Sequence, residues 1–171
     1  MVLILINLLW LSMQKILVSA CLLGERVRYD GGDCRQSGLI AQWQSEGRLI
    51  AICPEVAGGL SVPRPPAEMV LGDADFVLRG CGKICTEHGA DVTDAFVDGA
   101  EKALAQCMRH GIKIAILKEG SPSCGVSRVH DGAFSGIKIK GEGVTARLLR
   151  RHGVRVFSES EVERVAALLA C

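Results

Sequence analysis

The sequence lacks an excess of charge of either sign, because 20 basic residues stand against 19 acidic ones in 171 residues. A general nucleic-acid-binding protein is expected to carry a basic excess or a basic stripe. One local basic cluster is present, at Arg147, Arg150, Arg151 and Arg155. We interpret it as the solvated face and the C-terminal end of a helix. No stable nucleic-acid partner is therefore expected.

A membrane anchor and a secretion signal are also lacking. Residues 1–12 are almost wholly apolar, but this run is too short to span a bilayer. It has neither the basic n-region nor the small-residue cleavage site of a signal peptide. We interpret residues 1–12 as an extension before a single domain formed by residues 13–171. The expected protein is cytoplasmic, with no membrane partner.

Several familiar catalytic motifs are missing. No Ser–His–Asp order and no P-loop can be recognised, and residues 141–143 are too short for a dinucleotide fingerprint. His110 and His152 each precede a glycine at the end of a predicted helix, where the helix dipole favours a cation. His88 and His130 are predicted loop residues with no partner visible in the sequence. The histidines therefore indicate no site.

Cysteine, by contrast, is abundant, with eight residues. Disulfide frameworks belong mainly to small secreted domains that cannot build a core. This chain is long enough to bury a core, since nearly half of its residues are apolar. Several of the cysteines also lie inside apolar elements. A reduced protein with cysteines for metal binding or for core packing is the better interpretation.

Short apolar runs alternate with amphipathic segments along most of the chain. Strands are predicted over residues 15–20, 48–53, 112–117 and 154–157. Helices are predicted over residues 37–46, 94–110 and 142–152, with a last helix from about residue 160. Alternation of this kind implies right-handed crossovers and a mostly parallel sheet. The predicted fold is therefore α/β, a single-domain, Rossmann-like, three-layer arrangement.

Other segments are less regular in sequence. Residues 54–68 contain four prolines and two glycines, so we expect irregular structure and a functional loop there. Residues 76–78 suggest a short strand, residues 80–89 a hairpin or loop, and residues 134–140 an edge strand. Asp91 or Thr93 is the expected N-cap of the long helix that follows.

Three cysteines lie just past the ends of predicted strands. Cys21 and Cys53 end two of the apolar runs, and Cys124 lies in the loop after a third. Ligands bind outside the carboxyl ends of the strands in open α/β sheets. Each cysteine alone is as well explained as a small buried hydrophobe. Together, three thiolates at one sheet edge predict a metal or cluster site with an open coordination position.

The residues beside these cysteines are polar. Glu55 follows Cys53 by two residues, and Ser121 and Ser123 flank Cys124. A salt-bridged loop acid and a turn of small residues explain them equally well. The other cysteines are weaker candidates for metal binding. Cys34 is a candidate additional ligand, Cys81 and Cys85 are a weak candidate for a small metal knuckle, and Cys107 is predicted to be a core residue.

In combination, several of these motifs resemble the domain of unknown function 523 family, whose characterised members are thiouracil desulfidases. The matching segments are residues 15–24, 27–31, 53–55, 63–68, 91–93 and 121–125. They span nearly the whole chain after Met13.

The resemblance implies a [4Fe-4S] cluster held by Cys21, Cys53 and Cys124, with the fourth iron open to a substrate sulfur. It implies Glu55 and Ser121 as catalytic groups, and non-redox release of sulfide from a 2-thiouracil-like pyrimidine. A soft thiocarbonyl sulfur suits such an iron. Ser123 and Arg64 are candidate substrate-binding residues, and for Arg64 pairing with an acid is an equal alternative.

Two other functions stay open at this point. The chain is alternatively a zinc-based or thiol-based binding protein for a small molecule, without desulfidase activity. It is alternatively a sulfur carrier whose thiols cycle as persulfide or disulfide. For the desulfidase, the expected partner is a small thiolated heterocycle.

Overall fold

The computed structural model describes residues 14–170, so the predicted extension over residues 1–12 lies outside the described residues. The strands are β1 (Ile16–Ser19), β2 (Leu49–Ile52), β3 (Ala67–Leu71), β4 (Lys83–Thr86), β5 (Ile114–Leu117), β6 (Arg128–His130), β7 (Lys138–Lys140) and β8 (Arg155–Ser158). The α-helices are α2 (Leu39–Ser45), α3 (Pro54–Ala57), α4 (Ala74–Leu78), α5 (Thr93–His110), α6 (Val144–Arg151) and α7 (Val162–Leu169). Two 3₁₀ turns, η1 (Ala20–Leu23) and η2 (Glu159–Glu161), follow β1 and β8.

A four-stranded parallel sheet forms the centre of the fold, in the order β2-β1-β5-β8. Because β1 is buried on both faces, alternate residues serve different layers. Leu17 packs with α5 and α6 on one face, whereas Ile16 and Val18 pack with α2 and α7 on the other. The predicted α/β class with a mostly parallel sheet and three layers is therefore confirmed.

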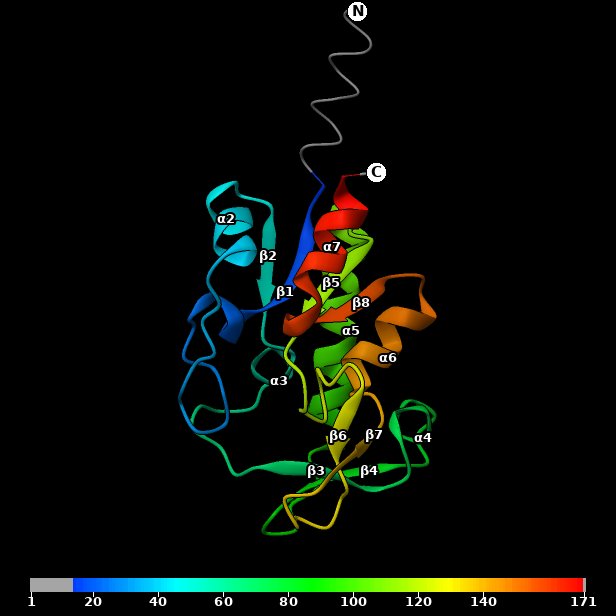
Figure 1. Cartoon of the computed structure of the whole chain (residues 1–171). Coiled ribbons are helices and arrows are strands. Elements are labelled where there is room, and N and C mark those ends of the chain that lie inside the picture. The colour runs from blue at the N-terminus through cyan, green and yellow to red at the C-terminus, as the bar shows by residue number, and fades with distance from the viewer. Residues whose placement is uncertain (1–13, 171) are drawn as a thin grey trace, which may run out of the picture.

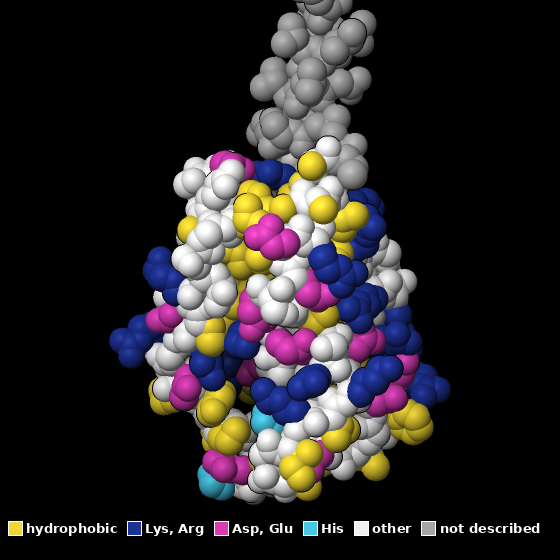
Figure 2. Space-filling model, in the orientation of Figure 1, with side chains coloured by type: hydrophobic (Ala, Val, Ile, Leu, Met, Phe, Trp, Pro, Cys, Tyr) yellow, Lys and Arg dark blue, Asp and Glu magenta, His cyan; other side chains and the backbone are white. Residues whose placement is uncertain are grey.

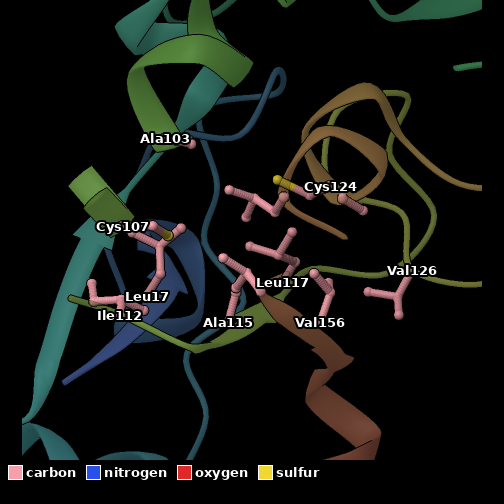
Figure 3. Close-up of a cluster of buried hydrophobic side chains, with 12 residues drawn as sticks. Leu17, Ala103, Cys107, Ile112, Ala115, Leu117, Cys124, Val126 and Val156 are labelled. Carbon is pink, nitrogen blue, oxygen red and sulfur yellow. The ribbon is translucent and has the colours of Figure 1, made fainter. Parts of the chain in front are cut away.

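The α5 face of the sheet is built from small and branched side chains (Figure 3). Ala103 and Cys107 of α5 pack there, in the same cluster as Leu17 and Leu117 of the sheet. Cys107 is 2% exposed, so its prediction as a core residue is confirmed. The same cluster reaches Cys124, so this sheet face connects directly to the loop after β5.

Two small antiparallel sheets, β3–β4 and β6–β7, lie beyond the carboxyl ends of the parallel strands (Figure 1). A third hydrophobic cluster joins them to the start of α5, with Phe96 and Ile84 fully buried in it. These two small sheets face the carboxyl edge of the parallel sheet. They therefore form the outer wall of the region where the three predicted cysteine loops end.

Four local predictions were wrong. Residues 54–57 form the short helix α3, because Pro54 takes the first helical position, where a missing N–H costs nothing. Strand β3 also begins inside the segment that we expected to be irregular.

Residues 76–78 belong to helix α4 and not to a strand. Its N-cap, Asp73, accepts the Phe76 N–H. Only residues 138–140 of the predicted edge strand are extended, paired with the unpredicted β6. Val92, not Asp91 or Thr93, is the N-cap of α5.

Helix α3 lies unusually close to α5. A Cβ on Gly99 of α5 would lie 1.9 Å from the carbonyl oxygen of Pro54, and one on Gly58 would lie 1.9 Å from that of Ala95. The two backbones are therefore in direct contact. This contact fixes the position of α3, and with it the start of the helix at Cys53.

We predict that Gly99→Ala destabilises the protein. At an exposed helix position this change stabilises by about 1 kcal/mol. Here the added methyl group must displace α3, and we expect a net loss of about 2 kcal/mol in the free energy of unfolding. Urea denaturation measures it, with the exposed α5 variant Glu101→Ala as control. Stabilisation by Gly99→Ala would show that α3 and α5 are not in backbone contact.

Candidate metal centre

The three predicted cysteines meet at one cavity. Cys21 lies in η1 directly after β1, Cys53 is the N-cap of α3 directly after β2, and Cys124 lies in the loop after β5. All three line the same cavity of about 650 Å³, which opens on the face shown in Figure 2. Cys21 and Cys124 are only 8% and 6% exposed. The parallel sheet thus brings together thiols that are up to 103 residues apart in sequence, Cys21 and Cys124.

The hydroxyl of Ser19 ties two of these loops together. Ser19 ends β1, and its Oγ accepts the backbone N–H of Lys118 at 2.9 Å, where the chain leaves β5. The same hydroxyl donates to Cys124, which by itself lowers the pKa of that thiol. Ser19 is 2% exposed, so this link is shielded from water. It holds the Cys124 loop next to the end of β1.

Burial disfavours the charged form of all three thiols. Burial, followed by the negative charges of Cys34 and Cys53, raises the pKa of Cys21 to about 12. Burial also raises the pKa of Cys53 and of Cys124, and the charges of Cys53, Glu55 and Cys21 add to the effect at Cys124. The thiols therefore share one electrostatic environment. A positively charged group between them would offset this cost, because metal ligation replaces thiol protons.

The three cysteines that line the cavity come from three different segments, after β1, β2 and β5. Within residues 14–170, no group of three or more His, Cys, Asp and Glu side chains is placed to hold a single metal ion. A [4Fe-4S] cluster receives each cysteine on a different iron. Three thiols on three segments are a donor set that such a cluster can use.

Glu55 faces the same cavity and is held by Arg64. The Arg64 Nε donates to Oε2 of Glu55 at 2.8 Å, and its terminal nitrogen lies 2.6 Å from the same oxygen. The remaining Arg64 donors reach the carbonyl oxygens of Val27 and Ser61, both at 3.1 Å. The side chain of Glu55 is 15% exposed and that of Arg64 is 7% exposed. Arg64 is thus paired with an acid. Its contacts fix the Oε2 atom of Glu55, and the Oε1 atom of Glu55 takes no part in them.

Ser121 is the polar group beside Cys124. Its Oγ accepts the N–H groups of Ser123 and Cys124, at 3.1 and 2.7 Å. A hydroxyl oxygen has two lone pairs and one proton. With both acceptor sites used by backbone, Ser121 has its proton left to donate, and the residue lines the cavity.

Ser123 does not line the cavity, although we expected it to contact a substrate. It is fully buried, and its hydroxyl pairs with that of Thr145 at 2.9 Å. The backbone carbonyl of Ser123 also accepts the Thr145 N–H at the start of α6. Ser123 therefore attaches the Cys124 loop to α6.

Glu119 holds the same loop in shape. Its carboxylate accepts the N–H groups of Val126, Ser127 and Arg128 at 2.8 to 3.1 Å, and the Ser127 hydroxyl at 2.9 Å. Burial by itself raises the pKa of Glu119, but these donors outweigh it and hold the pKa below the ordinary value of 4.5. One carboxylate thus closes the loop that contains Cys124.

The four other cysteines that the structure describes, Cys34, Cys81, Cys85 and Cys107, lie outside the cavity wall. Cys34 contacts the backbone of Cys21, whose carbonyl oxygen accepts the Cys34 N–H at 2.9 Å, and its Sγ accepts a hydrogen bond from Arg28 at 3.2 Å. Cys81 is exposed, and Cys85 pairs with Glu68 across the β3–β4 sheet. The seven described cysteines are all free thiols.

No sequence pattern indicates the outer wall of the cavity. Glu68, His130 and Lys138 line it, and they come from the small sheets β3–β4 and β6–β7. His130 was interpreted as a loop residue because β6 has only three residues and no clear alternation. Its position depends on pairing with β7, which local sequence does not reveal.

The fold and the cavity define an α/β protein with three cysteines gathered at the carboxyl edge of its parallel sheet. The chain belongs to the 2-thiouracil desulfurase family, whose sequence model matches residues 16–161. The resemblance inferred from the motifs is thereby confirmed.

Two relatives show how far the similarity extends. The chain is 45% identical over 150 residues to the protein YbbK of Bacillus subtilis (strain 168), which is 88% of this chain and 99% of YbbK. It is 50% identical to a solved structure of the [4Fe-4S]-dependent thiouracil desulfidase TudS, with a TM-score of 0.84. That alignment covers 92% of this chain and 98% of the TudS chain.

Among residues 14–170, no helix has the length and apolar character needed to cross a membrane.

We predict that Glu119→Gln destabilises the protein by about 2 kcal/mol at pH 7, because an amide replaces a carboxylate that accepts several hydrogen bonds. The folded pKa of Glu119 is lowered, so its contribution is complete above pH 5 and is lost as the pH falls below the ordinary value of 4.5. The difference between wild type and variant in urea denaturation should therefore shrink from pH 6 to pH 3.

The matched control is Glu25→Gln at an exposed loop position, which should change stability little at either pH. A difference for Glu119→Gln that stays constant down to pH 3 would contradict the assigned role of this carboxylate.

Proposed function

We propose that the chain is a [4Fe-4S]-dependent desulfidase that converts a 2-thiouracil-like pyrimidine and water into the oxo base and hydrogen sulfide. The observation that carries this proposal is the shared cavity, where Cys21, Cys53 and Cys124 lie beside Glu55 and Ser121. The similarity to the thiouracil desulfidase TudS, at 50% identity over 92% of the chain, supports it. The reaction exchanges sulfur for oxygen at one carbon, so no electrons are gained or lost.

The donor set suits the proposed cofactor. Cys21, Cys53 and Cys124 would hold the cluster. Burial raises the pKa of each thiol, at Cys21 against the charges of Lys118 and Arg28 and at Cys53 against that of Arg64. When bound, the cluster supplies an iron with an open coordination position, which a soft thiocarbonyl sulfur can occupy. Only three cysteines line the described cavity, which leaves this position free.

Glu55 is the proposed general base. Arg64 holds Oε2, so the carboxylate has a fixed direction and Oε1 is available to a water molecule in the cavity. By removing a proton from that water, Glu55 makes it a better nucleophile toward the carbon that carries sulfur. The same carboxyl group can then return the proton to the departing sulfur.

Ser121 is the proposed hydrogen-bond donor to the substrate. Two backbone N–H groups polarise its hydroxyl and use its acceptor sites. The remaining proton can stabilise the oxygen that water has added, as this oxygen loses its own proton and the sulfur departs. A prearranged donor of this kind contributes about 3 kcal/mol to lowering a barrier.

One test of the proposed function concerns the iron–sulfur cluster. Anaerobically purified protein should be brown and contain about four iron and four labile sulfide per chain. Cys21→Ala, Cys53→Ala and Cys124→Ala should each lose most of the iron and all sulfide release from 2-thiouracil. Cys81→Ala, at an exposed position outside the cavity, is the control and should keep both. Full activity in a colourless, iron-free preparation would refute the proposal.

The second prediction separates Glu55 from Arg64. Glu55→Gln should keep the iron content but lower kcat by about 100-fold to 10,000-fold, because no group is left to accept the water proton. Arg64→Lys keeps the positive charge but loses the forked contact with Oε2. We expect it to lower kcat by about 10-fold to 100-fold, with little change in KM.

Steady-state kinetics with 2-thiouracil measures both variants, at iron contents matched to wild type. An Arg64→Lys variant with a raised KM and an unchanged kcat would instead identify Arg64 as a substrate-binding residue.

A further inference from the structure

A buried ring nitrogen in the cavity wall has no hydrogen-bond partner. The Nδ1 atom of His130 is inaccessible to solvent, and among residues 14–170 it has no hydrogen-bond partner. Oε1 of Glu68 lies 3.7 Å from it. Buried polar groups are nearly always satisfied, so an exception calls for an explanation.

Glu68 offers the missing partner. This residue of β3 is 6% exposed, and its Oε2 accepts the N–H groups of Gly132 and Phe134 at 2.9 and 3.1 Å. Oε1 has no part in those contacts and faces His130. A carboxylate accepts hydrogen bonds only, so the Nδ1 atom facing it must carry the proton. In neutral His130 the Nε2 atom is then an acceptor.

The position of His130 relates it to the proposed reaction site. Gly120 and Val129 form a parallel bridge between the Cys124 loop and β6. The next residues along the two segments are Ser121 and His130, and both line the cavity. The side chain of His130 is one-third exposed, although Nδ1 is covered. Solvent therefore reaches parts of the side chain other than Nδ1, and His130 and Ser121 line the same cavity.

We propose that His130 is a substrate-binding residue whose Nε2 accepts a ring N–H of the heterocyclic thioamide, and that Glu68 is the positioning residue that fixes its tautomer. This inference rests on the proposed function, because it assumes that the cavity binds a thiolated heterocycle. Together with Ser121, a hydrogen-bond donor, His130 as an acceptor matches the alternating carbonyl and N–H groups of a pyrimidine edge. The pair selects rings with a free N–H over N-alkylated rings.

Three variants test the polarity of this contact. Asn places its amide near the position of Nδ1, whereas Gln places its amide near that of Nε2. His130→Asn should raise KM for 2-thiouracil about 10-fold, through loss of one hydrogen bond. His130→Gln should stay within about 3-fold of wild type. Glu68→Gln turns an amide N–H toward Nδ1 and reverses the tautomer, and it should raise KM as His130→Asn does, with kcat little changed.

Methylated substrates make the test specific. For wild type, one of 1-methyl-2-thiouracil and 3-methyl-2-thiouracil should have a KM about 10-fold above that of 2-thiouracil. In His130→Asn this penalty should disappear, because the contact is already lost. A purely structural role would leave the penalty unchanged. Wild-type kinetics in His130→Asn, or a penalty that persists in it, overturns the inference.

A binding measurement separates this inference from the proposed function. Calorimetry with the cluster-loaded protein and uracil needs no turnover, and we expect about 10-fold weaker binding in His130→Asn but not in His130→Gln. If no protein releases sulfide yet binding depends on His130 in this way, the desulfidase proposal fails and the inference stands. If wild type releases sulfide and binding is equal in all variants, the inference alone fails. Iron content and melting temperature are compared throughout, and Glu68→Gln, which keeps His130, replaces His130→Asn if that variant does not fold.

Discussion

The parallel pairing of β1 with both β2 and β5 is the constraint on which the site depends. Because these strands run in the same direction, the segments that follow them leave from one edge of the sheet. Cys21, Cys53 and Cys124 are carried by those three segments and therefore meet at one cavity. The Ser19 hydroxyl reinforces this register by accepting the Lys118 N–H.

The walls of the cavity are held rigidly, whereas ionisation of the thiols that line it is disfavoured. Its walls are fixed by the close contact of α3 with α5 and by the hydrogen bonds of Glu119. It is lined by the buried thiols of Cys21 and Cys124 and the half-buried thiol of Cys53, and removal from water raises the pKa of all three. Bound iron would turn this cost into a favourable interaction, since thiolate and metal charges offset each other. Cluster binding is therefore expected to stabilise the folded protein.

Much of this arrangement was predictable from the sequence. Cys21, Cys53 and Cys124 each follow an apolar run, and the rule for parallel sheets places such residues at one edge. Other parts depend on contacts between distant segments. The helix at Pro54–Ala57 is not predicted because the four prolines and two glycines of residues 54–68 indicate a loop, whereas the close packing of this helix on Gly99 depends on a distant segment. His130 was missed because β6 exists only through its pairing with β7.

In the proposed site, Cys21, Cys53 and Cys124 are the protein ligands of a cluster that lies beside Glu55 and Ser121. A crystal structure of anaerobically prepared protein, with iron located by anomalous scattering and 2-thiouracil soaked in, tests this ligand set. We expect four iron sites in the cavity, protein sulfur on three of them from Cys21, Cys53 and Cys124, and the pyrimidine between Glu55 and Ser121. A fourth protein ligand such as Cys34, or a pyrimidine bound outside this cavity, would contradict it.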